Sequence, residues 1–313
     1  MQLSVVIPLY NKASTVARSI RSVLSQKYHD FELILVDDGS TDSSLAKVEE
    51  FDDRRLKIVS QENKGVSAAR NHGVDVAVNS FVCFLDADDE WKPDFLSAIA
   101  SLIKSNPDAG IYTCRYSEID EQGNPFIGKT VLPEKFAGEV TEFFRTFAQS
   151  RSFICSSNIC FNRKYLREIG GFPVRAKVGE DIYVWLRLAL LAPVMHDSRV
   201  LSVIHRDAEN RTSSRLKPLM PFHIMFFFNV DDSGDDSYLR TNEALRTFLF
   251  KNGLLFAADA AMRGDRKLAR NYSRLFMTHN IRYAIAIFFL SYTPSFLIET
   301  IRYLRNKWST RSV

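Results

Sequence analysis

Residues 31–40 read FELILVDDGS, an apolar run that ends in a cluster of acidic and small polar residues. Apolar runs of the same kind lie on both sides of it, at residues 3–9, 56–59 and 81–85. The stretches between these runs have apolar residues at helical spacing and cover about residues 16–24, 43–51 and 66–78. Short strands that alternate with helices of this length form a largely parallel sheet with helices on both faces. The sequence therefore predicts an α/β fold with a Rossmann-like, mostly parallel sheet.

Polar residues follow three of the predicted strands at the point where each strand ends. Tyr10 and Asn11 follow the first strand, Asp37 and Asp38 follow the second, and residues 86–89 (DADD) follow the fourth. In open sheets of this kind, ligands bind beyond the carboxyl ends of the strands. We therefore expect these three segments, which are far apart in sequence, to meet at one ligand-binding crevice.

The composition is that of an ordinary globular protein. The chain has 313 residues, 46% of them hydrophobic and 25% charged, which is enough for one large core or for a core with an appendage. The N-terminus passes directly into the first predicted strand and does not read as a secretory signal. The cysteines, Cys83, Cys114, Cys155 and Cys160, have no regular spacing. This indicates reduced, buried thiols, so we expect a cytoplasmic protein.

The net charge of +4 is confined to the C-terminal end of the chain. Residues 281–313 hold five basic residues and one acidic residue, so residues 1–280 are neutral overall. A nucleic-acid-binding protein would more often carry its basic excess across a folded face, interleaved with aromatic residues. We therefore expect no nucleic-acid partner.

The strongest single signal for chemistry is the run FLDADD at residues 84–89. Three carboxylates directly after a buried strand repel one another unless something compensates their charge. One compensation is a divalent cation that bridges to a diphosphate, because Mg²⁺ and Mn²⁺ often bind through one or two carboxylates and substrate phosphates. The alternative is capping of the helix expected near Pro93, and a similar alternative, a turn with helix capping, applies to Asp37 and Asp38. An Asp-x-Asp sequence alone does not decide between metal binding and helix capping.

Five blocks of the sequence resemble the family-2 inverting glycosyltransferases, whose nucleotide-binding core is called the GT-A fold. The blocks are VVIPLYNK (5–12), SQ (25–26) with FELILVDDGSTD (31–42), ENKGVSAARN (62–71), DADD (86–89) and GED (179–181). They occur in the family's order and spacing and cover about residues 3–212. The resemblance implies an enzyme, a hexosyl- or N-acetylhexosaminyl-transferase, that moves a sugar from a nucleotide-diphospho-sugar to a hydroxyl acceptor.

The resemblance places the nucleotide-sugar on residues of these blocks, namely Pro8, Tyr10, Asn11, Asp38, Lys64, Arg70, Asp86 and Ala87. Pro8 and Tyr10 would line the base pocket, with the Tyr10 ring stacked on the base. Asp38 would accept the hydrogen bond from the ring N–H of uracil, which favours a UDP-sugar over a purine donor, while thymidine would fit the same edge. Arg70 would face the diphosphate as a charged donor, and Asp86 would lie near the ribose.

The resemblance also implies a divalent cation, Mn²⁺ or Mg²⁺, with Asp88 as its ligand. The cation would stabilise the departing diphosphate as a Lewis acid. His205 is a second candidate ligand, because some relatives place a histidine near this position. Its spacing to Ser213 is longer than in the commonest version of that pattern, so a structural role for His205 stays open. Arg206 and Arg211 are candidates for contacts with phosphate or acceptor.

Inversion by a single displacement needs a base that takes the proton of the acceptor hydroxyl as this oxygen attacks the anomeric carbon. The run GED at residues 179–181 places two carboxylates at the start of a predicted helix. In the family pattern the second acid is the base, so the resemblance assigns this role to Asp181, with Glu180 as the alternative. An acidic pair that only interacts favourably with the helix dipole is the structural reading.

The sequence does not favour three other functional classes. Residues 123–130, GNPFIGKT, match the phosphate-loop pattern, but no buried strand precedes them and Pro133 obstructs a following helix. We therefore predict a surface hairpin or loop there and no ATP or GTP hydrolysis. A nucleotidyltransferase would need a basic, glycine-rich loop near the N-terminus, where residues 8–11 read PLYN. A non-catalytic sugar- or lipid-binding module would be favoured by the loss of Asp88 or Asp181, and both are present.

The pattern divides the chain into three parts. Residues 1–108 are the predicted nucleotide-sugar-binding half, 109–220 the acceptor-binding and catalytic half, and 221–313 a helical C-terminal extension. Within the extension, the apolar run 284–290 is interrupted before 296–298. An uninterrupted apolar span of about 20 residues, as needed to cross a bilayer, is therefore absent from the sequence there.

Two readings of this extension stay open. In one, residues 226–228 and 288–290 share the core of a helical subdomain. In the other, a pair of interfacial helices lies on anionic lipid, with Trp308 at the boundary. The basic residues that would then lie at the headgroups are Arg302, Arg305, Lys307 and Arg311.

A saccharide or lipid-linked saccharide is the expected acceptor, in cell-surface polysaccharide or lipid-linked oligosaccharide synthesis. In the second reading of the extension, the enzyme would make peripheral contact with the inner face of the cytoplasmic membrane.

Overall fold

The computed structural model of the chain describes residues 1–206, 218–230 and 234–294. It divides into two compact units. Unit 1 consists of Met1–Ala176 and Glu180–Arg211, and unit 2 of Lys177–Gly179 and Thr212–Val313. The predicted nucleotide-sugar half, 1–108, lies entirely in unit 1, as do nearly all described residues of 109–220.

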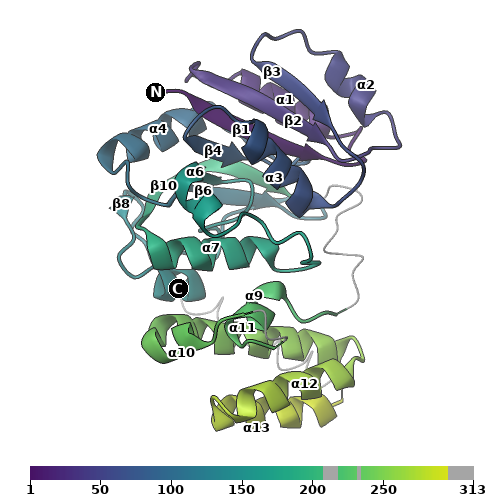
Figure 1. The fold of residues 1–313 in the computed structure, drawn as a ribbon, viewed down its shortest axis with the longest axis vertical. Helices are drawn as coiled ribbons and strands as arrows, with labels where there is room; N and C mark the ends of the chain where they lie inside the picture. The colour runs from purple at the N-terminus through teal and green to yellow at the C-terminus, as the bar shows by residue number, and fades with distance from the viewer. Residues whose placement is uncertain (207–217, 231–233, 295–313) are drawn as a thin grey trace. The chain divides into compact units, whose positions relative to one another are not determined.

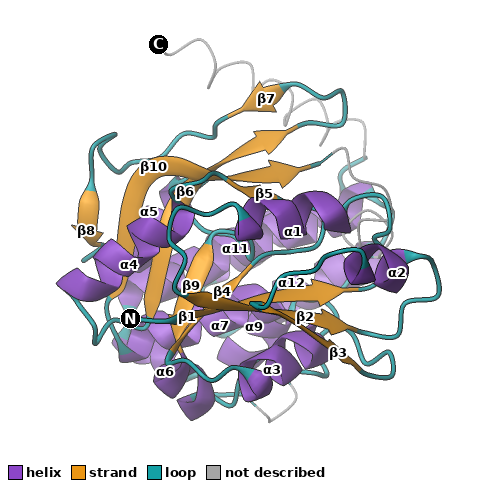
Figure 2. Cartoon of the chain, turned by 90° about the horizontal axis from the view of Figure 1, so that it is seen from above, coloured by secondary structure: helices purple, strands orange, loops and turns teal. Residues whose placement is uncertain are grey.

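Unit 1 is built on a single mixed sheet (Figures 1 and 2). Its strands are β1 (Leu3–Leu9), β2 (Phe31–Asp37), β3 (Leu56–Ser60), β4 (Phe81–Phe84), β5 (Glu90–Trp91), β6 (Ile111–Ile119), β7 (Pro125–Phe126), β8 (Ala137–Glu139), β9 (Ile159–Asn162) and β10 (Val194–His205). Their order is β3-β2-β1-β4-β9-β6-β10-β5, with β7 on β6 and β8 on β10. The first four strands are parallel, as predicted. The sheet as a whole is mixed, because β9 runs antiparallel to both β4 and β6, while β6 and β10 pair in parallel.

Helices cover both faces of this sheet. They are α1 (Val16–Leu24), α2 (Ser44–Glu49), α3 (Val66–Val76), α4 (Phe95–Ser105), α5 (Phe143–Gln149), α6 (Arg163–Glu168) and α7 (Glu180–Leu191). Figure 2 shows α1 and α3 on opposite sides of β1 and β2. On one side Val6 packs against Gly73 of α3, where an added Cβ would lie 2.4 Å from the Val6 side chain. Burial on both faces explains why β1 reads as a continuous apolar run.

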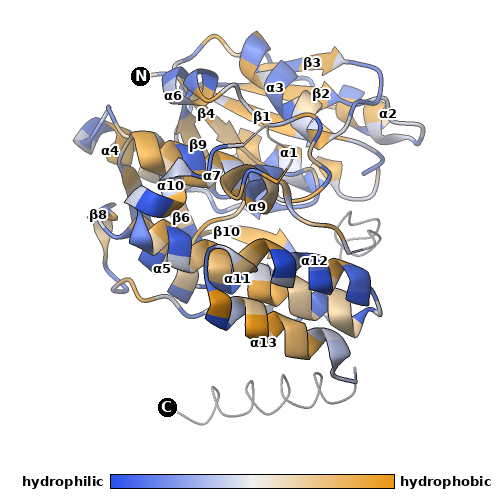
Figure 3. Cartoon of the chain, turned by 60° about the horizontal axis from the view of Figure 1, so that its bottom comes forward, coloured by the Kyte–Doolittle hydropathy of each residue, from blue (hydrophilic) through white to orange (hydrophobic). Residues whose placement is uncertain are grey.

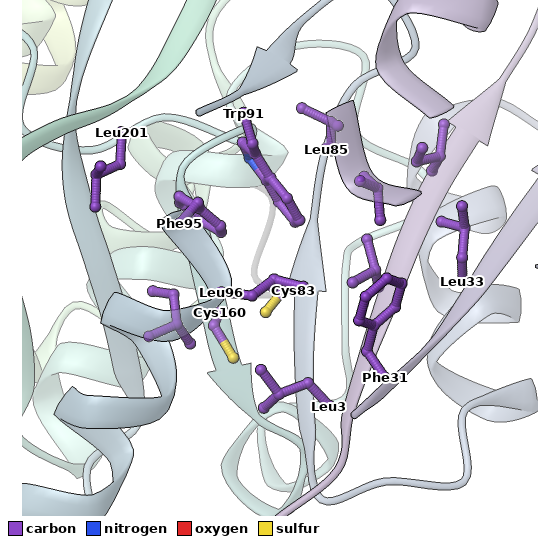
Figure 4. Packing of buried hydrophobic residues seen from close by; sticks show 14 of the residues in the cluster. Leu3, Phe31, Leu33, Cys83, Leu85, Trp91, Phe95, Leu96, Cys160 and Leu201 are labelled. Atoms are coloured by element: carbon purple, nitrogen blue, oxygen red, sulfur yellow. The ribbon is translucent and has the colours of Figure 1, made fainter. Parts of the chain in front are cut away.

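The core of unit 1 lies between the sheet and the helices α1 and α4. Figure 4 shows part of it, with the Trp91 and Phe95 rings stacked at a centroid distance of 4.0 Å. Cys83 and Cys160 lie opposite each other on β4 and β9, fully buried. All four cysteines are unpaired; Cys83, Cys114 and Cys160 are buried, as predicted, whereas Cys155 is only partly buried.

Residues 118–126, which include the start of the GNPFIGKT run, form a hairpin between β6 and β7. Glu118 pairs with Phe126 across the two strands, and the N–H of Asp120 donates to the carbonyl of Asn124 at 3.0 Å. The predicted surface hairpin is therefore confirmed, and no helix begins at Thr130, as a phosphate loop would require.

The described part of unit 2 is helical. It contains α9 (Phe222–Phe227), α10 (Ser237–Thr241), α11 (Glu243–Met262), α12 (Arg266–Met277) and α13 (Ile281–Tyr292). The side chains of Asn242, Asp265 and Asn280 accept backbone N–H groups at the starts of α11, α12 and α13, as N-cap residues do.

The core of unit 2 is aromatic. The Phe276 ring lies 4.8 Å from the ring of Phe250 and 4.9 Å from that of Phe228. Phe288 and Phe289 do not join this core, because both are exposed. The predicted shared core of 226–228 with 288–290 is therefore wrong for these two phenylalanines. No helix among the described residues is long and apolar enough to cross a membrane.

Candidate active site

Hydrogen bonds join the loops that follow β1 and β2, so two of the three segments that were predicted to meet do lie together. Asn11, in the left-handed region at φ 51°, accepts the N–H of Thr41 on its Oδ1 atom at 2.8 Å. The N–H of Asn11 donates to Ser40 Oγ at 3.1 Å, and the N–H of Lys12 donates to Ser44 Oγ at 2.7 Å. The Asn11 side chain therefore holds the two loops together.

The predicted base pocket has one exposed aromatic ring. Tyr10 is 46% exposed, so its ring is accessible for stacking on a base. Pro8 is buried inside β1, paired with Val36 of β2. Pro8 therefore contributes through the position of the strand rather than through an exposed surface.

Asp38 is buried and holds the loop that precedes α3. Its Oδ1 atom accepts the N–H of Lys64 at 2.8 Å and the side-chain amide of Gln61 at 2.7 Å. Its Oδ2 atom accepts the N–H of Gly65 at 2.8 Å. Asp37 instead accepts the N–H of Ser40 at 3.1 Å, which confirms the turn reading for that residue.

The residues of DADD divide between the site and the interior. Ala87 is buried, and its carbonyl accepts the Thr15 hydroxyl at 2.8 Å. Asp89 is also buried, accepts the Ser157 hydroxyl and the N–H of His205, and has a pKa raised well above its usual value, chiefly by burial. Asp86 and Asp88 remain as the carboxylates of the site.

Asp88 is paired with a lysine. Its Oδ2 atom lies 2.6 Å from Nζ of Lys12, and its carbonyl accepts a hydrogen bond from Arg18. Within the described residues, no three His, Cys, Asp or Glu side chains are grouped to hold a metal. Mg²⁺ and Mn²⁺ are commonly held by one or two carboxylates together with substrate phosphates. Asp88 therefore fits a cation that arrives with a diphosphate, but not a cage made by the protein alone.

His205 lies at the end of β10 and contacts β5. Its Nε2 atom is 3.1 Å from Oε1 of Glu90, and its N–H donates to Asp89 at 2.9 Å. These contacts favour the structural reading of His205 over the metal-ligand reading. Arg206, the next residue, pairs with the buried Glu118. Arg211 lies outside the described residues.

Arg70 joins the DADD block to the GED block. Its Nη2 atom lies 2.9 Å from Oδ1 of Asp86, and its Nη1 atom lies 3.5 Å from Oε1 of Glu180. The Arg70 side chain is 4% exposed, and its guanidinium lies over the ring of Phe172. The structure therefore directs the Arg70 charge at two carboxylates, where the sequence predicted a diphosphate.

Asp181 lies in the first turn of α7 and differs from its neighbour Glu180. Burial and the charge of Glu180 raise the pKa of Asp181 to about 7, although Arg70 acts in the opposite direction. A helix N-terminus alone would favour the ionised form, so burial outweighs the helix dipole here. A pKa near neutrality suits a general base. Glu180 is instead held by Arg70.

Sequence reasoning assigned no role to several residues that support the site. Lys12, Thr15 and Arg18 contact residues 86–89 from the start of α1 and the loop before it. Their spacing of three residues along the chain, directly after the first strand, is a signal that could have identified them. Ser157, which donates to Asp89 and accepts the N–H of Asp86, lies in a segment without any recognisable pattern.

The fold and the site are those of an α/β protein with carboxylates at the carboxyl ends of its parallel strands. Residues 4–170, more than half of the chain, match the family described as Glycosyl transferase family 2. The chain therefore belongs to glycosyltransferase family 2 and is a glycosyltransferase.

Two similar proteins are bacterial glycosyltransferases. The Escherichia coli UDP-Glc:alpha-D-GlcNAc-diphosphoundecaprenol beta-1,3-glucosyltransferase WfgD is 33% identical over 187 residues, which cover 59% of this chain and 69% of that protein. The amylovoran biosynthesis glycosyltransferase AmsB of Erwinia amylovora is 35% identical over 176 residues, which cover 54% of this chain and 58% of that protein. The matched segments thus leave a substantial part of each relative uncovered.

A solved structure shows the same fold. Residues 1–349 of S. aureus TarS, in complex with UDP-GlcNAc, superpose with a TM-score of 0.61 at 19% identity, covering 96% of this chain and 92% of that one. This similarity confirms the GT-A fold that the sequence predicted.

Proposed function

We propose that this glycosyltransferase moves a sugar from a UDP-sugar to a hydroxyl of a saccharide or lipid-linked saccharide, with inversion at the anomeric carbon. The observation that carries the proposal is that Asp181, with a pKa of about 7, interacts electrostatically with Arg70, which pairs with Asp86 at the end of β4. It joins a group suited to proton transfer with the carboxyl ends of the strands, where ligands of such sheets bind.

The donor would bind across the ends of β1, β2 and β4. The Tyr10 ring would stack on the uracil, and a free lone pair of Asp38 would accept the uracil N–H beside the bonds it makes to Lys64 and Gly65. Asp86 would accept a ribose hydroxyl while it stays paired with Arg70. Asn11 and Ala87 would shape the pocket through the main chain that they fix. The name of the E. coli relative, which specifies UDP-Glc, supports a uridine donor.

A divalent cation, Mn²⁺ or Mg²⁺, would be held by Asp88 together with the diphosphate of the donor. When bound, it supplies charge stabilisation to the departing diphosphate. Lys12 would remain close to the same phosphates, because its ammonium group already lies beside Asp88. His205 would support the site from behind, through Asp89 and Glu90.

Asp181 would act as the base. Its ionised carboxylate takes the proton of the acceptor hydroxyl while that oxygen forms a bond to the anomeric carbon. The bond from this carbon to the diphosphate oxygen breaks on the opposite side, and its electron pair leaves with the UDP. The charge of Glu180, which is paired with Arg70, helps to keep the pKa of Asp181 high enough for proton transfer near neutral pH.

The proposal extends to the acceptor and to the cellular location of the enzyme. The E. coli relative is named for a diphosphoundecaprenol-linked acceptor and the Erwinia relative for amylovoran biosynthesis. Both names support a role in cell-surface polysaccharide or lipid-linked oligosaccharide synthesis. A lipid-linked acceptor would place the enzyme in the cytoplasm at the inner face of the membrane.

A thermal-shift panel tests the donor. Uridine, thymidine and guanosine diphosphate sugars and the nucleoside triphosphates are added separately to the full chain with and without Mn²⁺, because specific binding raises the melting temperature. UDP-sugars with Mn²⁺ should give the largest rise. Stabilisation by guanosine diphosphate sugars alone, or by nucleoside triphosphates in preference to UDP-sugars, would contradict the proposal and favour a nucleotidyltransferase.

A further inference from the structure

Helix α13 has two unlike faces. Its buried positions are Ala284, Ile287 and Ser291, which repeat at helical spacing. Its exposed apolar and aromatic positions repeat at the same spacing and are Ile281, Ile285, Phe288, Phe289 and Tyr292. Figure 3 shows the strongly hydrophobic colouring of this helix. One face is therefore packed, while the other presents a stripe of large apolar side chains to solvent.

The packed face joins α13 to the other helices of unit 2. The Ser273 hydroxyl of α12 donates to the Ala284 carbonyl at 2.8 Å, and Tyr283 stacks on Phe250 of α11 at 5.2 Å. Leu290 packs against Ala261 and Ala269. These contacts fix which face of α13 points outward, so the exposed stripe is a consequence of the fold.

The exposed side chains of the stripe are contiguous rather than scattered singly over the surface. Phe289 is 66% exposed, and the Phe288 ring lies 5.9 Å from the ring of Phe289 and 5.0 Å from that of Tyr292. Three adjacent aromatic rings that remain exposed cost free energy in water. Contiguous exposed apolar patches of this kind mark interaction surfaces in proteins.

The charged residues within α12 and α13 are all of one sign. Every charged residue of α12 and α13 is basic, namely Arg266, Lys267, Arg270, Arg274 and Arg282. The Arg270 guanidinium lies 5.8 Å from the centre of the Tyr292 ring, at the border of the stripe. Arg266 and Arg274 are one turn away from Arg270 on the same face of α12. An apolar stripe bordered by cations complements an anionic lipid surface, whose headgroups are negative and whose interior is apolar.

We propose that the outer face of α13, together with the arginines of α12, is the surface by which this enzyme binds an anionic membrane. The helix would lie in the plane of the interface, with its aromatic rings among the upper acyl chains and Arg270 and Arg274 at the phosphates. With 12 residues it is about 18 Å long, too short for a bilayer core of about 30 Å. The inference rests on the proposed function in one respect only. Membrane binding is useful to the enzyme because a lipid-linked acceptor would lie in the same membrane.

Vesicle co-sedimentation of the full chain tests this surface without donor or acceptor. Vesicles of phosphatidylcholine alone are compared with an equal mixture of phosphatidylcholine and phosphatidylglycerol. The chain should pellet with the anionic vesicles, and less so when the salt rises from about 0.1 M to about 1 M, because screening shortens the range of the attraction. A chain that stays in the supernatant with anionic vesicles at low salt would overturn the proposal.

Two sets of variants locate the contact. The double variant Phe288→Ser with Phe289→Ser should lower binding to anionic vesicles by about tenfold or more, because each ring loses its apolar burial. The double variant Arg270→Gln with Arg274→Gln should lower it by about fivefold for each charge and leave binding to neutral vesicles unchanged. Val78→Ser, at a position that is 67% exposed in unit 1, is the matched control and should bind like the wild type.

The alternative occupant of this face is a second copy of the chain. Sedimentation equilibrium without lipid tests for this self-association. The wild type should have the same mass as the Phe288→Ser, Phe289→Ser variant. Self-association that this variant abolishes, without vesicle binding, would show that the face joins two copies and would overturn the membrane proposal. Because the proposal does not involve the donor site, a failed donor test would leave these results unaffected.

Discussion

The Nζ atom of Lys12 lies 2.6 Å from Oδ2 of Asp88, and both side chains are mostly buried. The carboxylate that we assign to the divalent cation is therefore already paired with a cation of the chain itself. A metal ion that binds at Asp88 must share this carboxylate with Lys12 or displace the lysine toward the phosphates. Metal affinity should accordingly depend strongly on the presence of the donor diphosphate.

Replacing Asp88 with Ala should remove the effect of the metal on UDP binding. Wild-type affinity for UDP should rise at least about tenfold with Mn²⁺, since the cation contributes several kcal/mol of charge stabilisation in such sites. The variant should bind UDP equally with and without Mn²⁺, because Lys12 remains to attract the phosphates. Titration calorimetry measures the UDP affinity of the wild type and of the variant. The control is Asp94→Ala, which removes the surface ion-pair partner of Lys27. A variant whose UDP binding still responds to Mn²⁺ would exclude Asp88 as the ligand.

Replacing Arg70 with Met should destabilise unit 1. The substitution leaves the carboxylates of Asp86 and Glu180 without their common partner, and loss of one partner of a buried ion pair costs about 3 kcal/mol or more. Urea denaturation measures the change. Lys27→Met is the control, and its exposed pair with Asp94 should contribute less than about 1 kcal/mol. Equal stability of the two variants would show that the Arg70 pairs contribute little.

The pH dependence of transfer should have an acid limb that belongs to Asp181. The base works only when ionised, and its pKa is about 7, so kcat/KM should fall as the pH decreases below that value. Glu180→Gln removes a negative charge that raises this pKa. The acid limb should therefore move to lower pH in the variant. A limb that stays in place or moves to higher pH would contradict the assignment of the limb to Asp181.

The stability of Asp181→Asn should depend on pH in a defined direction. The folded chain holds the Asp181 pKa at about 7, above the usual value of 3.8, so the folded state binds the proton more tightly than the unfolded state. Ionised Asp181 then destabilises the fold, and this cost appears as the pH rises from about 4 through about 7. The melting temperature of the variant relative to the wild type should therefore be higher at about pH 8, where the full cost is present, than at about pH 5, where only part of it is. An equal change at both pH values would show that Asp181 is not shifted.

Most of the first 91 residues could be predicted from the sequence, because there each apolar run forms a strand and is followed locally by its helix. The strand predicted over residues 81–85 ends one residue earlier, at Phe84, and the helix predicted near Pro93 begins at Phe95. The insertion of β9 between β4 and β6 could not be predicted. Its four residues, Ile159–Asn162, contain no signal for a partner or a direction, because pairing is decided by contacts far along the chain.

The candidate site was predictable as a set of segments but not as a set of contacts. The blocks that hold Asp38, Asp86 and Asp88 do lie at the ends of parallel strands. The pair between Arg70 and Glu180 joins residues separated by 110 positions, and no local pattern indicates it. The outward direction of Phe288 and Phe289 likewise depends on how α13 packs, which the apolar run alone leaves open.

The central claim is that Asp181 is the base of an inverting transfer from a UDP-sugar. The most direct test measures the anomeric configuration of the product by NMR, using an α-linked UDP-sugar and a diphospholipid-linked saccharide as acceptor, with wild type and Asp181→Asn compared. We expect a β-linked product, a turnover at least about a hundredfold lower in the variant, and UDP affinity that is nearly unchanged. An α-linked product, or a variant that retains more than about a tenth of the wild-type turnover, would contradict it.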